Sequence, residues 1–350
     1  MEYRKLGSSD LDVSRVCLGS MTWGFQNNQN DADTQIEYAF DKGVNFIDTA
    51  ELYAVPPTAE TYGKTETIIG NWIANNREKR ESFILASKIA GPGFDYIRKG
   101  SPITGKSVKL ALDGSLKRLQ TDYIDLYQLH WPNRQTAHFS KHWPNMISFS
   151  QTDTKAHTEQ MQDILESLQE CIAAGKIRHC GLSDDSPWGI QTYIELSKKY
   201  DLPRMVSIQN EFNLLHTKDW PYLIEQCIHE DIAYLPWSPM AGGMLSGKYI
   251  HGARPTGSRW SLQPQSGLFR DTKNGEQAVI ALSDVAQRHG YTTAQLALAW
   301  CNSIDGVTST IIGATTMDQL KENIAAFDKT INEEIANEID SVLRNYPLPF

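Results

Sequence analysis

Four chemically active side chains stand at or just after the ends of three apolar segments. They are Asp48 at the end of Val44–Asp48, Tyr53 five residues further on, Lys88 at the end of Phe83–Lys88, and His130 at the end of Ile124–His130. Singly, each has an ordinary structural explanation, such as a helix cap or a snorkelling lysine. If the segments are parallel strands, however, their carboxyl ends meet at one edge and gather the four side chains.

Such a cluster could protonate a carbonyl oxygen. Hydride attack on a carbonyl builds negative charge on its oxygen, and an acid must then neutralise that charge. Tyrosine is a weak acid at neutral pH, but a neighbouring Lys88 ammonium would stabilise the phenolate and lower its pKa. Asp48 would balance the buried lysine, and His130 could donate a hydrogen bond to the same oxygen. The four residue types therefore indicate acid-catalysed reduction of a carbonyl.

Short apolar runs rich in β-branched residues alternate along the chain with longer segments of helical periodicity, which predicts parallel strands joined by right-handed crossovers. The predicted strands are Val16–Gly19, Val44–Asp48, Phe83–Lys88, Ile124–His130, Ile177–Leu182, Val206–Gln209, Ile232–Pro236 and Thr310–Gly313. The predicted helices are Asp31–Lys42, Thr65–Asn76, Val108–Leu119, Met161–Ala174, Trp188–Lys199, Trp220–Glu230, Gly275–Cys301 and Met317–Ala326.

Two α/β architectures satisfy this alternation, a doubly wound sheet and a closed (β/α)₈ TIM barrel. Eight strands favour the barrel, and so does the segment Gly19–Gly24, which lacks the glycine spacing of a dinucleotide-binding turn. We therefore predict one barrel domain over residues 1–350. Before it, Tyr3–Leu6 and Leu11–Val13 flank a turn, which predicts a β-hairpin that plugs the barrel floor.

Two connections are too long to be simple turns. Ile89–Ser107 and Trp131–Glu159 both follow carboxyl ends of strands, where barrels place their active sites, so we predict that they shape the substrate site. A third stretch, Ser246–Leu268, is rich in Gly, Pro and Ser and is predicted to be a mobile loop. Three histidines of the second connection invite a metal interpretation: His138, His142 and His157. Without a carboxylate or cysteine at ligand spacing, we predict no metal.

The bulk composition limits the partners and the compartment. The net charge is −9, from 33 basic and 42 acidic residues, which argues against general nucleic-acid binding. The five cysteines include no CxxC pair, which predicts reduced thiols. The amino-terminal residues lack the apolar core of a signal peptide, and no stretch approaches the roughly 20 apolar residues of a membrane span. We therefore expect a cytoplasmic protein without a membrane partner.

Five motifs, in this order, resemble the aldo-keto reductase superfamily and in particular its bacterial Tas-type branch. They are Leu18–Gly24, Phe46–Tyr53, Leu116–Leu126, Ala174–Arg178 and Ile311–Asn323. The resemblance covers nearly the whole chain. It implies a catalytic tetrad of Asp48, Tyr53, Lys88 and His130, with Tyr53 as the general acid, and NADPH as the cofactor that reduces an aldehyde or ketone.

The resemblance also implies where the nicotinamide end of NADPH lies. Ser183, Asp184 and Gln209 match the positions that hold the carboxamide, and Trp237 matches the aromatic residue that stacks on the ring. Asp184 departs from the family pattern, which has Asn there. A carboxylate cannot donate to the carboxamide oxygen, although it can accept from the carboxamide NH₂. The effect of this change is left open by the sequence.

Further cofactor contacts are implied along the rest of the molecule. They are Thr22, Trp23 and Asp48; Ser238, Pro239, Met240, Gly242 and Lys248 for the pyrophosphate; Ser258 and Arg259 for the 2′-phosphate; and Gly313, Thr315, Gln319, Glu322 and Asn323 for the adenosine. Many relatives carry basic residues at the positions of Gly313 and Gln319, and these are missing here. Arg259 is the main residue that favours NADPH over NADH.

Two other functions remain open. Some barrels of this superfamily are redox-sensing regulatory subunits that bind NADPH with little turnover, but the complete tetrad favours catalysis. A Schiff-base aldolase using Lys88 is disfavoured, because Asp48 would keep that lysine charged. The predicted substrate walls are Trp23, Tyr53, His130 and Trp131, which suggest an apolar or aromatic small-molecule carbonyl without identifying it. The sequence gives no indication of the oligomeric state.

Overall fold

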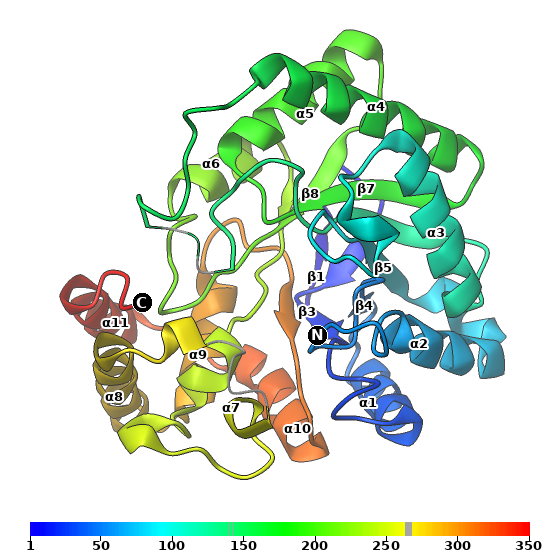
Figure 1. Cartoon of the computed structure of the whole chain (residues 1–350). Coiled ribbons are helices and arrows are strands. Elements are labelled where there is room, and N and C mark those ends of the chain that lie inside the picture. Colours follow the sequence, from blue (N-terminus) through cyan, green and yellow to red (C-terminus); the bar gives the residue numbers. More distant parts are fainter. Residues whose placement is uncertain (140, 142, 263–267) are drawn as a thin grey trace.

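Eight parallel strands form the centre of the computed structural model, which describes residues 1–139, 141, 143–262 and 268–350 (Figure 1). The strands are β3 (Val16–Gly19), β4 (Phe46–Asp48), β5 (Ile84–Ile89), β6 (Ile124–Leu129), β7 (Ile177–Ser183), β8 (Met205–Gln209), β9 (Ala233–Tyr234) and β10 (Thr310–Ile312), with β10 beside β3. The amides of Thr308 and Ile311 donate to the carbonyls of Tyr234 and Pro236 at 2.9 Å and join β10 to β9. The predicted (β/α)₈ fold and its strands are confirmed.

Helices surround these strands (Figure 1). They are α1 (Gln29–Asp41), α2 (Lys64–Asn75), α3 (Gly105–Leu119), α4 (Thr154–Ala173), α5 (Pro187–Tyr200), α6 (Tyr222–His229), α7 (Arg259–Leu262), α8 (Lys273–Arg288), α9 (Thr293–Ser303), α10 (Met317–Ala325) and α11 (Glu333–Asn345). Each of the predicted segments between Asp31 and Glu230, and Met317–Ala326, is helical. Most ends are shifted by a few residues, but α4 begins at Thr154 rather than Met161, within the predicted connection Trp131–Glu159.

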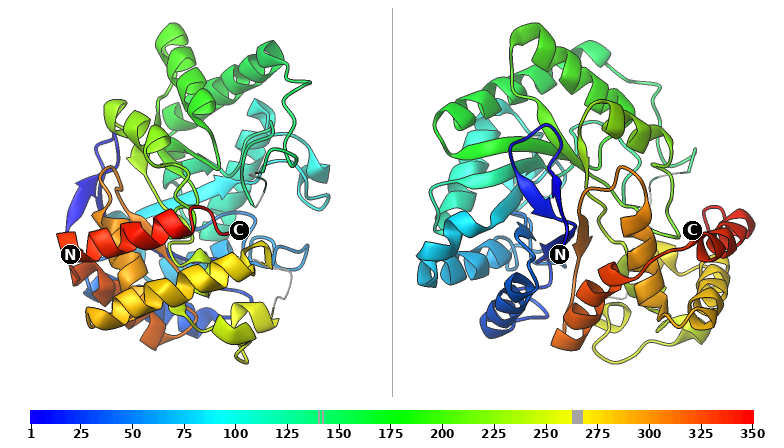
Figure 2. Two further views of the ribbon diagram at one scale, coloured as in Figure 1. Left: turned by 90° about the vertical axis from the view of Figure 1, so that its left-hand side faces the viewer. Right: turned by 180° about the vertical axis from the view of Figure 1, so that it is seen from behind.

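Two helical predictions need correction. The segment Gly275–Cys301 is not one helix but two, because Gly290 adopts φ +70° after α8 and Thr292 caps α9 by accepting from the Gln295 amide at 3.1 Å. The helix α11 was not predicted. It begins at the cap Asn332 and packs against α8, where the His289 ring nitrogen lies 3.0 Å from Glu338 (Figure 2).

The amino-terminal hairpin closes the floor of the barrel. Its strands β1 (Tyr3–Lys5) and β2 (Asp12–Ser14) pair antiparallel, and Figure 2 shows the hairpin on the side opposite to the view of Figure 1. Leu6, Leu11 and Val13 are buried in one apolar cluster with residues from the amino ends of the barrel strands, such as Phe46 and Ile84. This contact confirms the predicted plug and leaves the carboxyl ends of the strands as the open end.

Gly7, at the hairpin turn, is a position where a side chain does not fit. Its φ is +55°, and a Cβ would lie 2.3 Å from the Val206 carbonyl oxygen and 2.7 Å from that of Asp231. We expect Gly7→Ala to lower the free energy of unfolding by about 2–4 kcal/mol, the sum of overpacking and left-handed strain. Urea denaturation measures this. Gly175→Ala is the control, because Gly175 has φ +70° and open space around it, so it should cost only about 1 kcal/mol. Equal losses at both sites would contradict the packing explanation.

The long connections after β5 and β6 pack together at the open end. Trp131 and Ile97, one from each connection, share an apolar cluster with Leu52, and Tyr53 packs against it. Both connections therefore lie beside Tyr53, as a role in shaping the substrate site would require. Of the predicted mobile loop Ser246–Leu268, residues 263–267 lie outside the described residues. In the described part, residues 251–257 are exposed, whereas Trp260 is buried and its ring stacks on Tyr249 at 4.1 Å.

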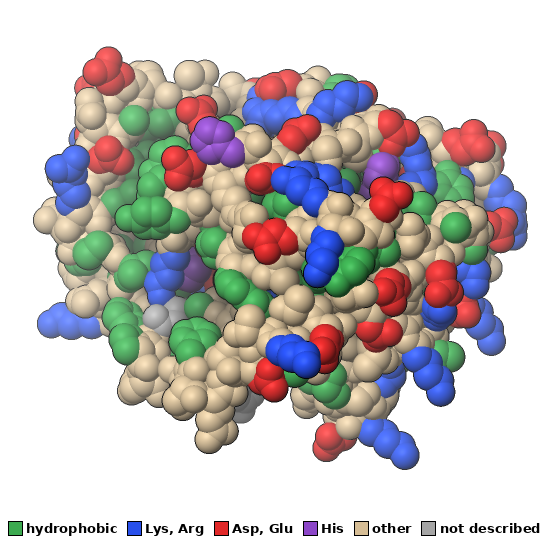
Figure 3. All heavy atoms as spheres, turned by 90° about the horizontal axis from the view of Figure 1, so that it is seen from above, with side chains coloured by type: hydrophobic (Ala, Val, Ile, Leu, Met, Phe, Trp, Pro, Cys, Tyr) green, Lys and Arg blue, Asp and Glu red, His purple; other side chains and the backbone are tan. Residues whose placement is uncertain are grey.

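Other general features agree with the composition. All five cysteines are buried and unpaired in disulfides. Among the described residues, no helix has the length and apolar character needed to cross a membrane. On the face drawn in Figure 3, Lys and Arg side chains are interspersed with Asp and Glu.

Candidate active site

A buried ion pair forms the base of the site. Strands β4 and β5 are neighbours in register, so Asp48 and Lys88 meet at their carboxyl ends, with Lys88 Nζ 2.6 Å from Asp48 Oδ2. The same ammonium donates to the Thr49 carbonyl at 2.8 Å, while Gln209 Nε2 donates to Asp48 Oδ1 at 2.9 Å. Both charged groups are almost fully buried. The predicted pairing of Asp48 with Lys88 is present.

Tyr53 and His130 lie beside this pair. Lys88 Nζ lies 5.0 Å from the centroid of the Tyr53 ring, and the Tyr53 and His130 rings are 5.7 Å apart, edge to face. The His130 amide donates to the Ile89 carbonyl at 2.9 Å, which extends the pairing of β6 with β5 to the histidine. The structure thus brings all four residues of the predicted tetrad together at the carboxyl ends of β4, β5 and β6.

The protonation of the tetrad follows from burial and from the Lys88 charge. Burial would lower the pKa of Lys88, but Asp48 and Tyr53 together outweigh it, so the pKa lies above its usual value and the lysine stays charged. Burial, reinforced by Lys88, lowers the pKa of His130 well below its usual value, so the ring is neutral. A neutral imidazole keeps one N–H that can donate. Its Nδ1 atom is buried without a hydrogen-bond partner among the described residues.

The pKa of Tyr53 corrects the sequence-based expectation. Lys88 does act to lower it, as expected, but burial is the larger effect and raises the pKa above its usual value. Tyr53 is therefore a protonated phenol over the whole physiological range. An acid that holds its proton until charge develops next to it suits proton donation, whereas a base would need the lowered pKa.

Glu51 is a structural support of the site that the sequence analysis missed. Its carboxylate is fully buried and accepts from the Ala90 amide at 2.7 Å, the Tyr62 hydroxyl at 2.9 Å and the Arg98 guanidinium at 2.9 Å. Its own amide donates to the Lys88 carbonyl at 3.2 Å. Glu51 therefore ties the segment of Tyr53 to the end of β5. The sequence did offer one signal for this role, because Glu51 is an acidic residue between the predicted catalytic residues Asp48 and Tyr53.

The predicted nicotinamide contacts also lie together. Ser183 and Gln209 are register partners on β7 and β8, and Asp184 follows directly. Trp237, which follows β9, donates from Nε1 to Asp184 Oδ1 at 3.2 Å. These residues and the tetrad share the open end of the barrel, because Gln209 also bonds Asp48. The donor and acceptor set fits a nicotinamide carboxamide and a ring face.

Basic side chains converge on the glycine-rich segment that begins at Ala241. Gly242 has φ +67°, and a Cβ there would lie 3.5 Å from Arg259 Nη1 and 3.7 Å from Arg270 Nη1. A Cβ on Gly243 would lie 3.5 Å from Lys248 Nζ. Small residues and adjacent cations make this segment suitable for a pyrophosphate. Arg270, which pairs with buried Glu211, was not predicted, because a lone Phe–Arg sequence carries no motif.

Arg259 and Ser258 are poised for an anion. The Arg259 guanidinium forms no ion pair among the described residues, and Nη2 donates to Met21 Sδ at 3.3 Å. Burial and the neighbouring Arg270 charge lower its pKa to about 10, so it still carries its charge at neutral pH. The Ser258 hydroxyl is buried, again without a partner in the described part of the chain. A phosphate group could accept hydrogen bonds from both side chains.

The predicted adenosine contacts gather where α10 begins. Gln319 Oε1 accepts from the Thr315 amide at 2.9 Å, and Asn323 Nδ2 donates to the Gly313 carbonyl at 3.1 Å. Glu322 accepts from the Thr292 hydroxyl at 2.7 Å. Gly313 has open space around it. The segment is thus held in one conformation by its own side chains and stays accessible at Gly313.

Trp23 and Trp131, both predicted to line the substrate site, lie in different parts of the structure. Trp23 is 0% exposed, packs in the main core and donates from Nε1 to Gln35 of α1 at 2.9 Å, so its ring presents no surface to a substrate. The neighbouring Thr22 is also buried. Trp131, by contrast, lies next to the tetrad, with its ring 4.9 Å from that of His130. The role of Trp131 as a wall of the substrate site stays a prediction, whereas Trp23 belongs to the main hydrophobic core.

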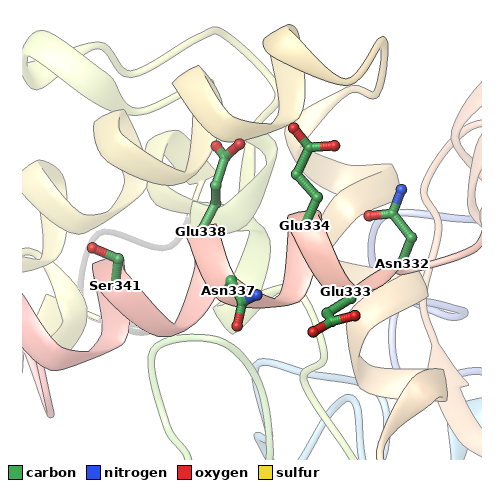
Figure 4. A pocket seen from close by; sticks show the side chains of 6 residues that line it. All are labelled: Asn332, Glu333, Glu334, Asn337, Glu338 and Ser341. Carbon is green, nitrogen blue, oxygen red and sulfur yellow. The ribbon is translucent and has the colours of Figure 1, made fainter.

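Of the three histidines of the connection after β6, two lie among the described residues, and they form no metal-ligand group there. His138 Nδ1 lies 2.7 Å from the Thr136 hydroxyl, and His142 lies outside the described residues. Within the described ranges, one group has metal-ligand spacing, His289 with Glu334 and Glu338. Figure 4 shows the two glutamates on α11, and Glu338 already binds Arg288 and His289. The ion pairs of Glu338 with Arg288 and His289 account for this group on α11 without a metal.

Comparison with known proteins agrees with the geometry. The model of the aldo/keto reductase family matches residues 15–344. The chain belongs to the aldo/keto reductase family and is therefore an oxidoreductase. Protein tas of Escherichia coli (strain K12) is 42% identical over 352 residues, covering 100% of this chain and 99% of that protein, and Protein tas of Shigella flexneri gives the same values. A Bacillus subtilis (strain 168) protein named uncharacterized oxidoreductase YrpG is 30% identical, covering 98% of this chain and 96% of its own.

Proposed function

We propose that this protein reduces an aldehyde or ketone to the alcohol with NADPH, with Tyr53 as the general acid. The observation that carries the proposal is the buried Lys88–Asp48 pair, 2.6 Å between Nζ and Oδ2, beside the rings of Tyr53 and His130. A buried charge of this kind is costly and contributes little to stability by itself. The Lys88 charge lies beside the protonated Tyr53 phenol, where it can stabilise the phenolate that proton donation leaves.

Each residue of the tetrad has one role in this proposal. Bound NADPH would supply the hydride. Tyr53 donates its proton to the substrate oxygen as charge develops there, and the Lys88 ammonium stabilises the phenolate that remains. Asp48 keeps Lys88 charged, and neutral His130 donates its N–H to orient the carbonyl. The Asp48 pairing also disfavours an imine on Lys88, which would need the neutral amine.

The preference for NADPH rests on Arg259 and Ser258. The Ser258 hydroxyl is buried without a partner among the described residues, and the partly buried Arg259 guanidinium has no carboxylate partner there. Both could bind the 2′-phosphate, which NADH does not have. Gly242, Lys248 and the segment before α10 would hold the rest of the cofactor. The buried, unpaired cysteines support a reducing compartment, and we propose that the protein is cytoplasmic.

The test is NADPH consumption with a panel of aliphatic and aromatic aldehydes and ketones, with NADH in parallel and with cofactor binding measured separately. We expect turnover with NADPH, and a Kd for NADPH at least about tenfold below that for NADH, equivalent to about 1.4 kcal/mol from the charged contact. Arg259→Met should remove most of that difference. Binding of NADPH without turnover of any substrate would instead favour the regulatory subunit, and absence of NADPH binding would refute the proposal.

A further inference from the structure

Asp184 is held rigidly at the mouth of the barrel. It follows β7 with φ +50°, its amide donates to the Gln209 carbonyl at 3.1 Å, and its carbonyl accepts from the Thr136 hydroxyl at 2.9 Å. The residue is 6% exposed and lines a small polar cavity with Trp237 and Asn210. The side chain therefore has a defined position from which it can meet a ligand.

The charge environment of Asp184 differs from that of the other buried carboxyl groups nearby. Asp48 pairs with Lys88, Asp185 with Arg134, and Glu211 with Arg270. Asp184 has no ion pair among the described residues, and the hydrogen bond that it accepts comes from the uncharged Trp237 indole. A buried carboxylate without a counter-charge is strongly unfavourable, and such a group takes up a proton instead.

The surroundings of Asp184, taken together, raise its pKa and favour the neutral carboxylic acid. From the segment after β8, Glu211 and Asp219 oppose a second negative charge, and His138 of the connection after β6 lines the same cavity. Lys88 of β5 and the Trp237 N–H favour the charge. Burial is larger than either, so the pKa of Asp184 is raised well above its usual value. Burial also raises the pKa of Asp219 to about 6, so above that pH Asp219 is ionised and opposes a charge on Asp184. His216 lines the same cavity.

We propose that Asp184 acts as a neutral carboxylic acid that binds the nicotinamide carboxamide, donating from its hydroxyl and accepting with its carbonyl oxygen. A carboxylic acid offers one donor and one acceptor, as an amide side chain does, whereas a carboxylate offers acceptors alone. A carboxamide needs both, a donor for its oxygen and an acceptor for its NH₂. This inference rests on the proposed function, and it explains how an acidic residue can stand where the ligand needs an amide.

The inference makes cofactor affinity depend on pH. Binding requires protonated Asp184, so the Kd for NADPH should be constant below the pKa and rise by up to about tenfold per pH unit above it. Asp184→Asn presents the same donor and acceptor at every pH. Its Kd should therefore stay flat where that of the wild type rises. Because the second ionisation of a phosphate is complete above about pH 7, the comparison runs from there to about pH 9.5.

The first experiment measures NADPH binding by quenching of tryptophan fluorescence in the wild type, Asp184→Asn and Asp185→Asn. The control Asp185→Asn removes a neighbouring carboxylate that pairs with Arg134, so it should keep the wild-type pH dependence. A wild-type Kd that rises with pH while that of Asp184→Asn does not supports the inference. Profiles that rise in parallel in the wild type and Asp184→Asn would overturn it while leaving NADPH binding intact. Two flat profiles require Asp184 to keep its proton up to about pH 9.5, and absence of the protonated-acid infrared band described below would then overturn the inference. Loss of binding in all proteins would overturn the proposed function as well.

The second experiment needs no cofactor. Infrared difference spectra between the wild type and Asp184→Asn report the C=O stretch of a protonated carboxylic acid, which a carboxylate lacks. We expect this band at neutral pH in the wild type and in Asp185→Asn, and its loss in Asp184→Asn. A difference spectrum that shows carboxylate bands instead would overturn the inference, whatever the cofactor measurements give.

Discussion

Tyr53→Phe is expected to lower kcat by about 10²–10⁴-fold, the usual contribution of a general acid. The substitution removes one hydroxyl and keeps the ring, which packs against the cluster of Leu52, Ala90 and Trp131. Affinity for NADPH should change little, because binding uses other residues. Steady-state kinetics with the best substrate of the panel, together with cofactor binding, measure both quantities. The loss should fall on kcat rather than on KM, because the proton is transferred in the transition state.

A matched control for this change is Tyr127→Phe. Tyr127 lies on β6, is fully buried, and its hydroxyl has no hydrogen-bond partner in the described part of the chain. Its removal should leave kcat unchanged. If Tyr53→Phe retained wild-type turnover, a different acid would have to protonate the substrate, and the tetrad would lose its central assignment.

Asp48→Asn should have the second large effect, on stability and on activity together. It leaves the Lys88 ammonium buried with the Thr49 carbonyl as its other hydrogen-bond acceptor, so the free energy of unfolding should fall by about 3–5 kcal/mol. Without Asp48, burial dominates and the pKa of Lys88 falls, which weakens the stabilisation of the Tyr53 phenolate. Chemical denaturation and kcat on the folded fraction measure the two effects.

Two further variants separate these effects. Asp125→Asn breaks another buried ion pair, with Arg80 at 2.8 Å, near the amino end of β6 and outside the candidate site, so it should lower stability without changing kcat. Asp48→Asn combined with Lys88→Met removes both charges. This double variant should regain part of the stability but none of the activity. Full stability in Asp48→Asn alone would show that Lys88 does not carry a charge in the folded protein.

The order of the barrel strands and the convergence of Asp48, Tyr53, Lys88 and His130 were accessible from the sequence. Alternating apolar runs and helical segments follow from local periodicity, and a barrel collects the carboxyl ends of its strands wherever the chain places them. For this reason Asp48, Lys88 and His130 could be assigned before any distance was known. The residues that the resemblance implies for the nicotinamide, Ser183, Asp184, Gln209 and Trp237, lie together beside Asp48, and their contacts with a cofactor are proposals.

The tertiary structure decided the properties that depend on neighbours distant in the chain. The break between α8 and α9, the presence of α11, the burial of Trp23, and the roles of Glu51 and Arg270 come from contacts that periodicity does not encode. The pKa of Tyr53 and that of Asp184 belong to the same group. Each is set by a balance of burial against particular charges. Two neighbouring residues of one type can therefore have different surroundings: Asp185 pairs with Arg134, whereas Asp184 has no ion pair among the described residues. Residue type and spacing determine which chemistry is possible at a position, whereas the surrounding packing determines the protonation state in which it occurs.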